Sequence, residues 1–307
     1  MDREVNYYQM KIQKNYEIQE DAPPAMSQKE YLEVCLKELN ETLILSSHDE
    51  KAFQEFFERN PVCLPGAFEI IGTSGHLPHN CALIKQPKIG NLASNRLPDF
   101  MWLAQDSTDF CPVMVEIERP SKKLFTGSGQ QCADFTQALG QIHEWKALLN
   151  QPSVIIDFYD YYDIPDYLRK KNFKPQYCLI YGRRYEYEGN ENLNRKRSQL
   201  TSDDIVLMSY DRILDMIINC KDDSFVTCTV GDKKYEVANI TPTFKYRPGW
   251  VRSLVGLTGF YEKIDDMPYI SKDRKQFLKE RYCYWINLGK QSSTGQNVGI
   301  INTLDDE

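Results

Sequence analysis

The chain of 307 residues carries 37 Lys and Arg against 44 Asp and Glu, which gives a formal net charge of −7. Its 41% hydrophobic and 12% aromatic residues suffice for a sizeable core and exclude a wholly disordered chain. No run reaches the roughly 18 consecutive apolar residues of a transmembrane helix, and the charged N-terminal stretch lacks the apolar region of a signal peptide. We therefore expect a cytoplasmic protein of about two domains, without a membrane partner.

The cysteines and the overall charge exclude several further classes of protein. No C-x-x-C occurs, so the sequence does not support a zinc ribbon or a thioredoxin-like site. The acidic balance excludes a surface that grips nucleic acid everywhere, although a local basic groove stays possible. We expect most of the nine cysteines to act as small buried hydrophobes; they are Cys35, Cys63, Cys81, Cys111, Cys132, Cys178, Cys220, Cys228 and Cys283.

Two helices are predicted after a polar N-terminal stretch, residues 1–26, that ends in the linker-like DAPPAM. The first covers residues 27–45, where Ser27 and Glu30 fit a capping box. The second covers residues 49–60 and ends before a proline. Their apolar residues recur at helical spacing, at Leu32, Cys35, Leu36, Leu39 and Leu43 in the first and at Phe53, Phe56 and Phe57 in the second.

Short apolar runs with turn signals predict the strands of a mixed sheet. Residues 67–72, 81–85, 96–105 and 111–120 read as strands, and the last two are separated by the polar turn DSTD, as in a hairpin. Helices and strands then alternate, with helices at 131–150, 190–200 and 210–220 and strands at 174–184 and 204–210. This order predicts an α/β core with a mixed central sheet flanked by helices.

The chain divides by its composition into three regions. Residues 1–49 form a partly helical N-terminal region, and residues 50–220 form the α/β core. Residues 221–307 are richer in isolated aromatic and turn residues and contain one expected helix at 271–288. We interpret this last stretch as a small C-terminal module of unknown role.

Three carboxylates are predicted to meet where two strands pair. Side chains alternate faces along a strand, so Glu116 and Glu118 share a face of the apolar segment PVMVEIE. Pairing of this strand with RLPDFMWL lets Asp99 approach Glu116. Such a cluster is a hard-oxygen site suited to Mg²⁺ or Mn²⁺, and Gln141 on the following helix can aim at it.

Two other interpretations of these residues stay open. The carboxylates at 116 and 118 could instead be salt-bridged to Arg119, Lys122 or a helix. Lys122 and Lys123 follow the strand directly and could contact a phosphate of a nucleic acid.

The combined pattern resembles the nuclease domain of the Shedu antiphage defence proteins, which belongs to the PD-(D/E)xK phosphodiesterase superfamily. The resemblance covers about residues 50–218. It is carried by FQEFFERNPVCL, by RLPDFMWLAQDSTDFCPVMVEIERPSKKLFTGSGQ with ADFTQALGQIHEWK after it, and by CLIYGRR, NLNRKRSQL and IVLMSYDRIL.

The resemblance implies a role for each candidate site residue. Asp99 and Glu116 become metal ligands, Gln141 becomes a polar helix residue that supports the site, and Glu118 stands where the superfamily usually has Lys. A Glu cannot supply the positive charge of that Lys. Three alternatives follow: Glu118 binds metal or activates water, Lys122 or Lys123 supplies the missing cation, or the site is weak or inactive.

Histidines and further acids are secondary candidates. His76 and His79, in the loop SGHLPHN, could act as a base or touch DNA, and we retain His76 as a candidate for nucleic-acid binding. Glu55 and Glu58 are candidates because related nucleases place an acidic residue on this helix. His143 lies two residues from Gln141 and so falls on a different helix face.

The resemblance implies a metal-dependent DNA endonuclease or nickase of a single-protein bacterial defence system, acting as a homo-oligomer, in particular a tetramer. A phage-encoded partner could serve as its trigger. The rival function is a catalytically weak or inactive sensor that keeps the fold and binds nucleic acid or a phage protein. An RNA-directed nuclease is a third alternative.

Overall fold

One mixed sheet runs through the computed structural model, which describes residues 16–70, 76–89, 97–220, 224–293 and 305–307. Its strands follow the order β6-β5-β3-β2-β1-β7-β8-β9, and β4 also pairs with β3. The mixed α/β class predicted from the sequence is confirmed. The strands are β1 (Ala82–Lys85), β2 (Phe100–Gln105), β3 (Asp109–Ile117), β4 (Asn172–Phe173), β5 (Gln176–Ile180), β6 (Ile205–Met208), β7 (Val226–Gly231), β8 (Lys234–Ile240) and β9 (Leu257–Thr258).

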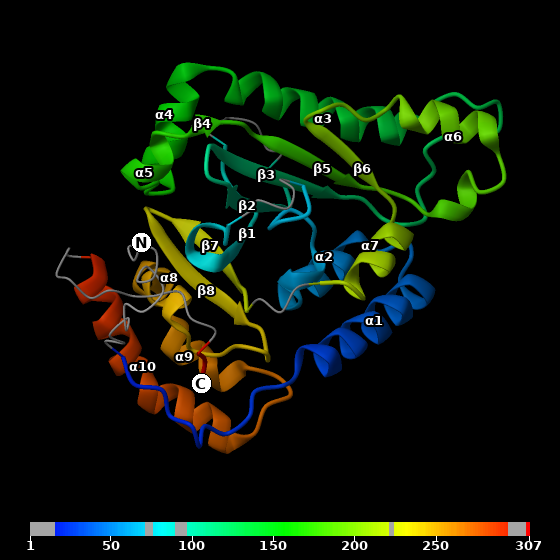
Figure 1. The fold of residues 1–307 in the computed structure, drawn as a ribbon. Coiled ribbons are helices and arrows are strands. Elements are labelled where there is room, and N and C mark those ends of the chain that lie inside the picture. The colour runs from blue at the N-terminus through cyan, green and yellow to red at the C-terminus, as the bar shows by residue number, and fades with distance from the viewer. Residues whose placement is uncertain (1–15, 71–75, 90–96, 221–223, 294–304) are drawn as a thin grey trace, which may run out of the picture.

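Helices cover both faces of this sheet (Figure 1). In that view α3 crosses above β5 and β6, whereas α2 and α7 lie below the sheet with α1 beneath them. The helices are α1 (Gln28–Leu45), α2 (Glu50–Arg59), α3 (Ala133–Leu149), α4 (Pro152–Tyr161), α5 (Asp166–Arg169), α6 (Glu191–Ser198), α7 (Tyr210–Ile217), α8 (Val251–Gly256), α9 (Phe260–Lys263) and α10 (Lys272–Ser293). None of the helices that the structure describes has the length and apolarity needed to cross a membrane.

The two N-terminal helices form as their sequence predicts. The capping box of α1 is confirmed: the Ser27 hydroxyl accepts from the Glu30 backbone N–H, while the Glu30 carboxylate accepts from Ser27. The α2 helix begins behind Asp49, whose carboxylate accepts from the Lys51 N–H. Its predicted aromatic face is fully buried at Phe53, Phe56 and Phe57. This packing fixes which side of α2 points toward the sheet.

The central strands pair as the hairpin pattern indicates. β2 and β3 are antiparallel with Phe100 opposite Val115 and Met101 opposite Met114. β3 then runs parallel to β5, and β5 parallel to β6. The C-terminal ends of β3, β5 and β6 therefore lie at the same edge of the sheet, beside the start of β2.

Several expected elements differ in the structure. Residues 67–70 form turns instead of the predicted strand, and the end of that prediction lies outside the described residues. Helices α4 and α5 and the elements β7 to α9 were not expected. The sheet also continues past the expected boundary at residue 221, since β1 pairs in parallel with β7. The domain division itself stays a prediction.

Candidate active site

Asp99 stands directly before β2 and is held from two sides. Its Oδ1 accepts from Nε2 of Gln54 on α2 at 2.6 Å, and its Oδ2 accepts from the backbone N–H of Ile117 on β3 at 2.8 Å. The strand pairing alone brings Asp99 beside the end of β3, as the sequence predicts. Two donors from different elements then fix the orientation of the carboxylate.

Glu116 lies on β3 and is only 9% exposed. Its Oε1 accepts from Nε2 of Gln141 on α3 at 2.9 Å, which places Gln141 at the site as predicted. Its Oε2 is buried without a hydrogen-bond partner. A buried carboxylate oxygen without a hydrogen-bond donor is costly when ionised in an apolar interior, and a proton, a cation or a substrate group at this atom would remove that cost.

Glu118, just beyond β3, forms an ion pair with Lys122. Its backbone carbonyl accepts from the Tyr210 hydroxyl at 2.9 Å. The salt-bridged alternative therefore holds for Glu118, whereas Glu116 accepts from a neutral amide. The Lys122 ammonium thus lies against the Glu118 carboxylate, as the second of the three alternatives for the missing cation requires.

Glu50 is a member of the cluster that sequence reasoning missed. It opens α2, and its carboxyl group shares a hydrogen bond with that of Glu118. Two carboxyl groups can share a hydrogen bond only when one of them carries a proton. The only sequence signal was its spacing: Glu50 precedes Gln54 by four residues and so lies on the same face of α2.

These acids raise one another's pKa. Burial, with the nearby charges of Glu50 and Glu118, raises the pKa of Asp99 to about 7. Burial and the charge of Glu118 likewise raise the pKa of Glu50 to about 7. For Glu116, burial and the charge of Asp99 raise the pKa well above its usual range. Acids that oppose one another's ionisation in this way favour a cation between them.

The sequence model of the family described as Shedu protein SduA, C-terminal, matches residues 47–214, more than half of the chain. The chain belongs to the Shedu family. Every residue of the carboxylate cluster lies within the matched range. A search of curated proteins returned no match. The predicted resemblance to Shedu is thus confirmed, and membership of this family indicates a protein of antiphage defence; the assignment to the PD-(D/E)xK superfamily stays a prediction.

Asp99 and Glu116 of this Shedu protein could serve as ligands of a divalent cation. Within the described ranges, no group of three or more His, Cys, Asp or Glu is arranged to hold a metal ion. Mg²⁺ commonly uses only one or two carboxylates and completes its shell with water and phosphate oxygens. Asp99 and Glu116 fit that mode, because the free Oε2 of Glu116 lies at a cluster whose acids raise one another's pKa.

Other predicted candidates of the Shedu chain lie away from the cluster. His76 hydrogen-bonds Ser107 and its backbone pairs with Gln105, at the opposite end of β2 from Asp99. Glu55 faces Lys51 and Glu58 faces Lys85. The structure therefore does not bring His76 or Glu55 to the cluster, and it pairs Glu58 with Lys85, which lies opposite Phe100, the residue after Asp99.

Two more histidines also lie outside it. His143 is exposed on α3. His79 packs against the Tyr235 ring, and burial lowers its pKa to about 4. His79 therefore has a packing role, and His143 lies on the solvent-facing side of α3.

A basic pocket lies beside the end of β6, at the same edge of the sheet as the end of β3. It has a volume of about 570 Å³ and is lined by Arg184, Arg197 and Arg212, among other residues. Its neighbour Arg183 pairs with Asp211, one residue after the Tyr210 that holds Glu118. Lys123 is exposed on the segment that follows Lys122. Positive charge therefore gathers along this edge of the sheet, on the segments that follow β3, β5 and β6, where a phosphate backbone could pass.

Proposed function

We propose that this Shedu protein is a metal-dependent DNA endonuclease or nickase with a PD-(D/E)xK-type core, acting in bacterial defence against phage. The observation that carries the proposal is the cluster of Glu116, which is buried, with the half-buried Asp99, Glu118 and Glu50, in which Glu116 Oε2 has no hydrogen-bond partner. Buried acids with raised pKa values mark functional sites more often than structural ones.

Asp99 and Glu116 would hold Mg²⁺ or Mn²⁺, and Glu118 could join them. The bound ion would polarise a water and neutralise charge on the reacting phosphate. Gln54 and the Ile117 N–H orient Asp99, and Gln141 orients Glu116. Lys122 supplies positive charge on the side of Glu118, where a superfamily Lys would otherwise stand.

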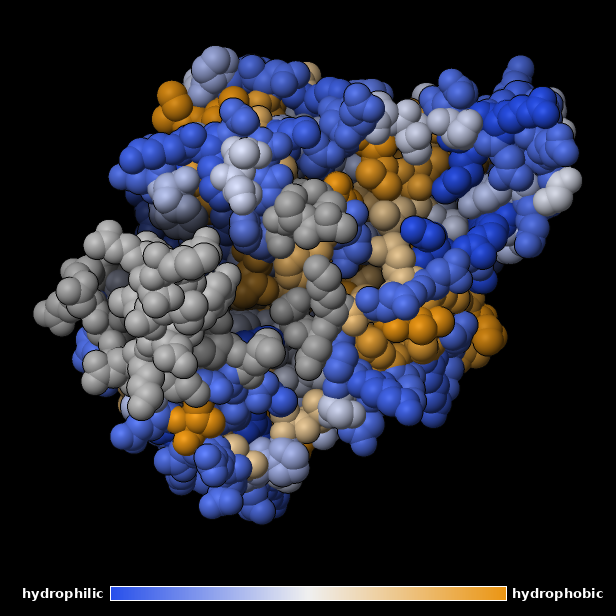
Figure 2. Space-filling model, in the orientation of Figure 1, coloured by the Kyte–Doolittle hydropathy of each residue, from blue (hydrophilic) through white to orange (hydrophobic). Residues whose placement is uncertain are grey.

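Nucleic acid is the class of substrate that the neighbouring surface favours, and DNA is the one that the family resemblance implies. Hydrophilic residues cover the projection formed by α6 (upper right in Figure 2), which carries Arg195, Lys196 and Arg197 in its last turn. Arg197, which lines the basic pocket together with Arg184 and Arg212, would hold phosphates beside the cleaved bond. A comparison of DNA and RNA substrates separates this proposal from an RNA-directed nuclease.

The proposal extends to assembly. Ile44 and Leu45 are 78% and 81% exposed at the end of α1, where Figure 2 displays an apolar patch. An exposed apolar patch of this kind marks a contact surface, and we propose that the protein forms a homo-oligomer, a tetramer by the family resemblance. A phage-encoded trigger belongs to the same proposal.

The first prediction concerns the two ligands. We expect Asp99→Asn and Glu116→Gln to lower plasmid cleavage in Mg²⁺ or Mn²⁺ by at least about 10²-fold, because each removes a charged ligand. Gln141→Ala should lower it by about 10- to 100-fold, since it only orients Glu116. Cleavage of supercoiled, linear and single-stranded DNA is the measurement. Glu55→Gln, which changes an exposed acid on α2, is the matched control.

Circular dichroism and thermal unfolding must show that these variants are folded. Cleavage at the wild-type rate by folded Asp99→Asn and Glu116→Gln proteins would overturn the proposal.

A non-catalytic sensor is the second candidate, favoured by the pairing of Glu118 with Lys122 in place of a free superfamily Lys. Such a protein would bind DNA or a phage protein without cutting. A ligand that binds only the folded state raises the unfolding temperature, so Mg²⁺ should stabilise the nuclease and not its Glu116→Gln variant. Absence of this stabilisation together with DNA binding would favour the sensor.

A further inference from the structure

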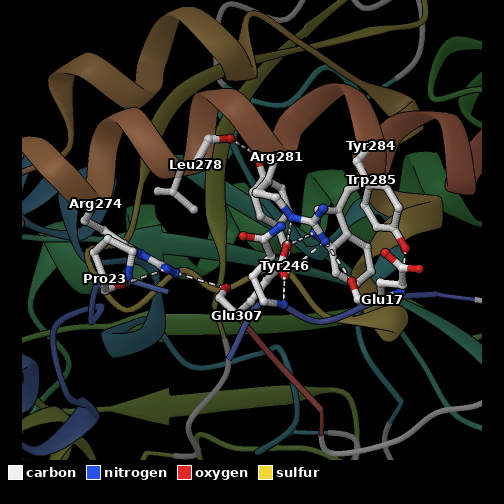
Figure 3. Close-up of polar contacts among 10 residues, drawn as sticks. Glu17, Pro23, Tyr246, Arg274, Leu278, Arg281, Tyr284, Trp285 and Glu307 are labelled. Carbon is white, nitrogen blue, oxygen red and sulfur yellow. Dashed lines mark hydrogen bonds and ion pairs between the residues drawn. The ribbon is translucent and has the colours of Figure 1, made fainter. Parts of the chain in front are cut away.

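Glu307 lies 4% exposed at a site far from the carboxylate cluster, between α10 and the segment that precedes α1 (Figure 3). Its carboxylate accepts two hydrogen bonds from Arg281, one of them at 3.0 Å, and one from Nε1 of Trp285. The backbone N–H of Gln19 donates to the same group at 2.7 Å. Four donors therefore surround one buried carboxylate, which is the pattern of a specific anion site.

The backbone of Glu307 is recognised as well. It exchanges two hydrogen bonds with Tyr246, at 2.9 and 3.0 Å, as two residues of antiparallel strands do. Arg274 also donates to the Glu307 carbonyl at 3.1 Å. Extended segments that bind in this way gain affinity from the main chain and specificity from one side-chain pocket.

The preceding acidic residues add surface contacts. Asp306 pairs with Lys245 at 3.2 Å, and Asp305 accepts from the Tyr16 hydroxyl at 2.8 Å. We call residues 305–307 the acidic segment. The surrounding groups, Tyr246, Arg274, Arg281 and Trp285 with residues 17–23, we call the arginine socket.

The walls of the arginine socket are joined without help from the acidic segment. Arg281 donates to the Glu17 carbonyl at 2.7 Å, and Arg274 donates to the carbonyls of Pro23 and Phe244 at 3.0 and 2.9 Å. The Tyr246 hydroxyl donates to the Leu278 carbonyl at 2.8 Å. Since these bonds already connect three distant parts of the chain, the socket is preorganised for its occupant.

The charge of the socket selects an acidic occupant. Arg274 is 1% exposed, its acceptors are carbonyl oxygens, and its Nε is buried without a partner. Burial lowers the pKa of Arg274 to about 10, at which the side chain still carries its charge at neutral pH. A pocket of about 560 Å³ is lined by Glu307, Lys245 and Arg274, among other residues. Arg281 thus faces the Glu307 carboxylate, and Arg274 faces the Glu307 carbonyl.

We propose that the arginine socket is a binding site for acidic peptide segments with a glutamate anchor, and that residues 305–307 of this chain are its exchangeable occupant. The site binds the anchor through Arg281 and Trp285 and the peptide backbone through Tyr246 and Arg274. The proposal does not depend on nuclease activity, because none of these residues lies at the carboxylate cluster.

A labelled peptide tests the exchange. The probe is residues 302–307 with a C-terminal amide, and the receptor is the full chain carrying Glu307→Gln, whose own segment has lost its anchor. Fluorescence anisotropy should give at least 10-fold tighter binding to this variant than to the wild-type chain, because an attached segment competes at an effective concentration of about 1 mM. A peptide with Gln at position 307 should bind at least about 10-fold more weakly.

Two further variants define the site. Asp306→Asn removes only a surface ion pair, so this chain should bind the peptide no better than the wild type. Arg281→Lys added to the Glu307→Gln chain should abolish binding, because Lys cannot make the two-bond contact. Equal affinity of a folded Glu307→Gln chain for the Glu and Gln peptides overturns the proposal.

Hydrogen exchange of the wild-type chain provides a test that needs no variant. The amides of Tyr246 and Glu307 should exchange by local opening, at rates insensitive to low denaturant, whereas those of α10 should require larger unfolding. If both sets exchange only together, the acidic segment is a permanent part of the core and the proposal fails.

Discussion

Asp99 and Glu116 keep their carboxyl groups where water is scarce, and among the residues that the structure describes neither forms an ion pair with an arginine or lysine. Both are instead oriented by amide donors, from Gln54, Gln141 and the Ile117 backbone. A neutral donor fixes the direction of a carboxylate without cancelling its charge. A cation that binds these acids would displace the protons that their raised pKa values retain, whereas the charge of the nearby Glu118 is already paired with Lys122.

The second prediction is a pH dependence of stability without metal. The pKa of Asp99 lies at about 7 in the folded chain against 3.8 ordinarily, so the folded state binds more protons between these values. Stability is then full at low pH and falls as pH rises from about 4 to 7. For one independent group the loss has an upper limit of about 4 kcal/mol, and Glu50 and Glu116, whose pKa values are also raised, contribute to the decline.

Urea unfolding in EDTA at pH 5 and pH 8 measures this loss. Asp99→Asn should flatten the decline, because the amide keeps the shape of the side chain and does not titrate. Its oxygen can accept from the Ile117 N–H, and its NH₂ can donate to the Gln54 amide oxygen once that amide turns over. An unchanged decline in that variant would show that Asp99 is not the titrating group.

Some site residues could be predicted from the sequence and others could not. Strand alternation places Glu116, and pairing of two apolar strands brings Asp99 to it, so local periodicity was sufficient. Glu50 and Gln54 come from a helix distant in sequence, and their role depends on how α2 packs on the sheet. Periodicity defines the faces of a helix but not what each face meets.

At the scale of elements, α2 illustrates that limit. Glu50, Gln54 and Glu58 form one stripe along the helix, four residues apart. Glu50 meets Glu118 and Gln54 meets Asp99, but Glu58 lies about 6 Å further along the axis and meets Lys85. The sequence predicted the helix and its buried face, but the candidates named on it were Glu55 and Glu58, whereas Glu50 and Gln54 make the contacts with Glu118 and Asp99.

The third prediction concerns the helices around the basic pocket. Arg212 on α7 is exposed and lines this pocket, whereas Arg195 on α6 is 81% exposed and pairs with Glu191. Arg212→Gln should weaken DNA binding at all sequences alike. It should also reduce the slope of log K against log salt by about 0.9, the loss of one phosphate contact.

Titrations in EDTA at several salt concentrations measure this slope without cleavage. Arg195→Gln is the matched control and should leave the slope unchanged if the pocket is the contact. Equal effects of the two substitutions would locate DNA elsewhere.

At the scale of the whole molecule, the sheet joins regions that the sequence separates. Residues 226–240 supply β7 and β8, and β7 continues the sheet beside β1. The alternation of strands and helices made the core predictable, but the strand at the join follows from a long-range parallel pairing. Such a pairing leaves no local pattern, because either partner would fit many neighbours.

The fourth prediction follows from this join. Phe225 is 3% exposed and its ring packs on Trp102 of β2, 4.9 Å between centroids, and on Phe68. Phe225→Ala should lower the free energy of unfolding by about 3–5 kcal/mol. Far-UV circular dichroism and tryptophan fluorescence should still give coincident urea transitions, because the strands on both sides of Phe225 belong to one sheet.

Tyr269→Ala, at a side chain 64% exposed, is the control and should leave the midpoint nearly unchanged. If residues 224–307 unfolded as an independent module, Phe225→Ala would separate the two transitions instead of shifting them together.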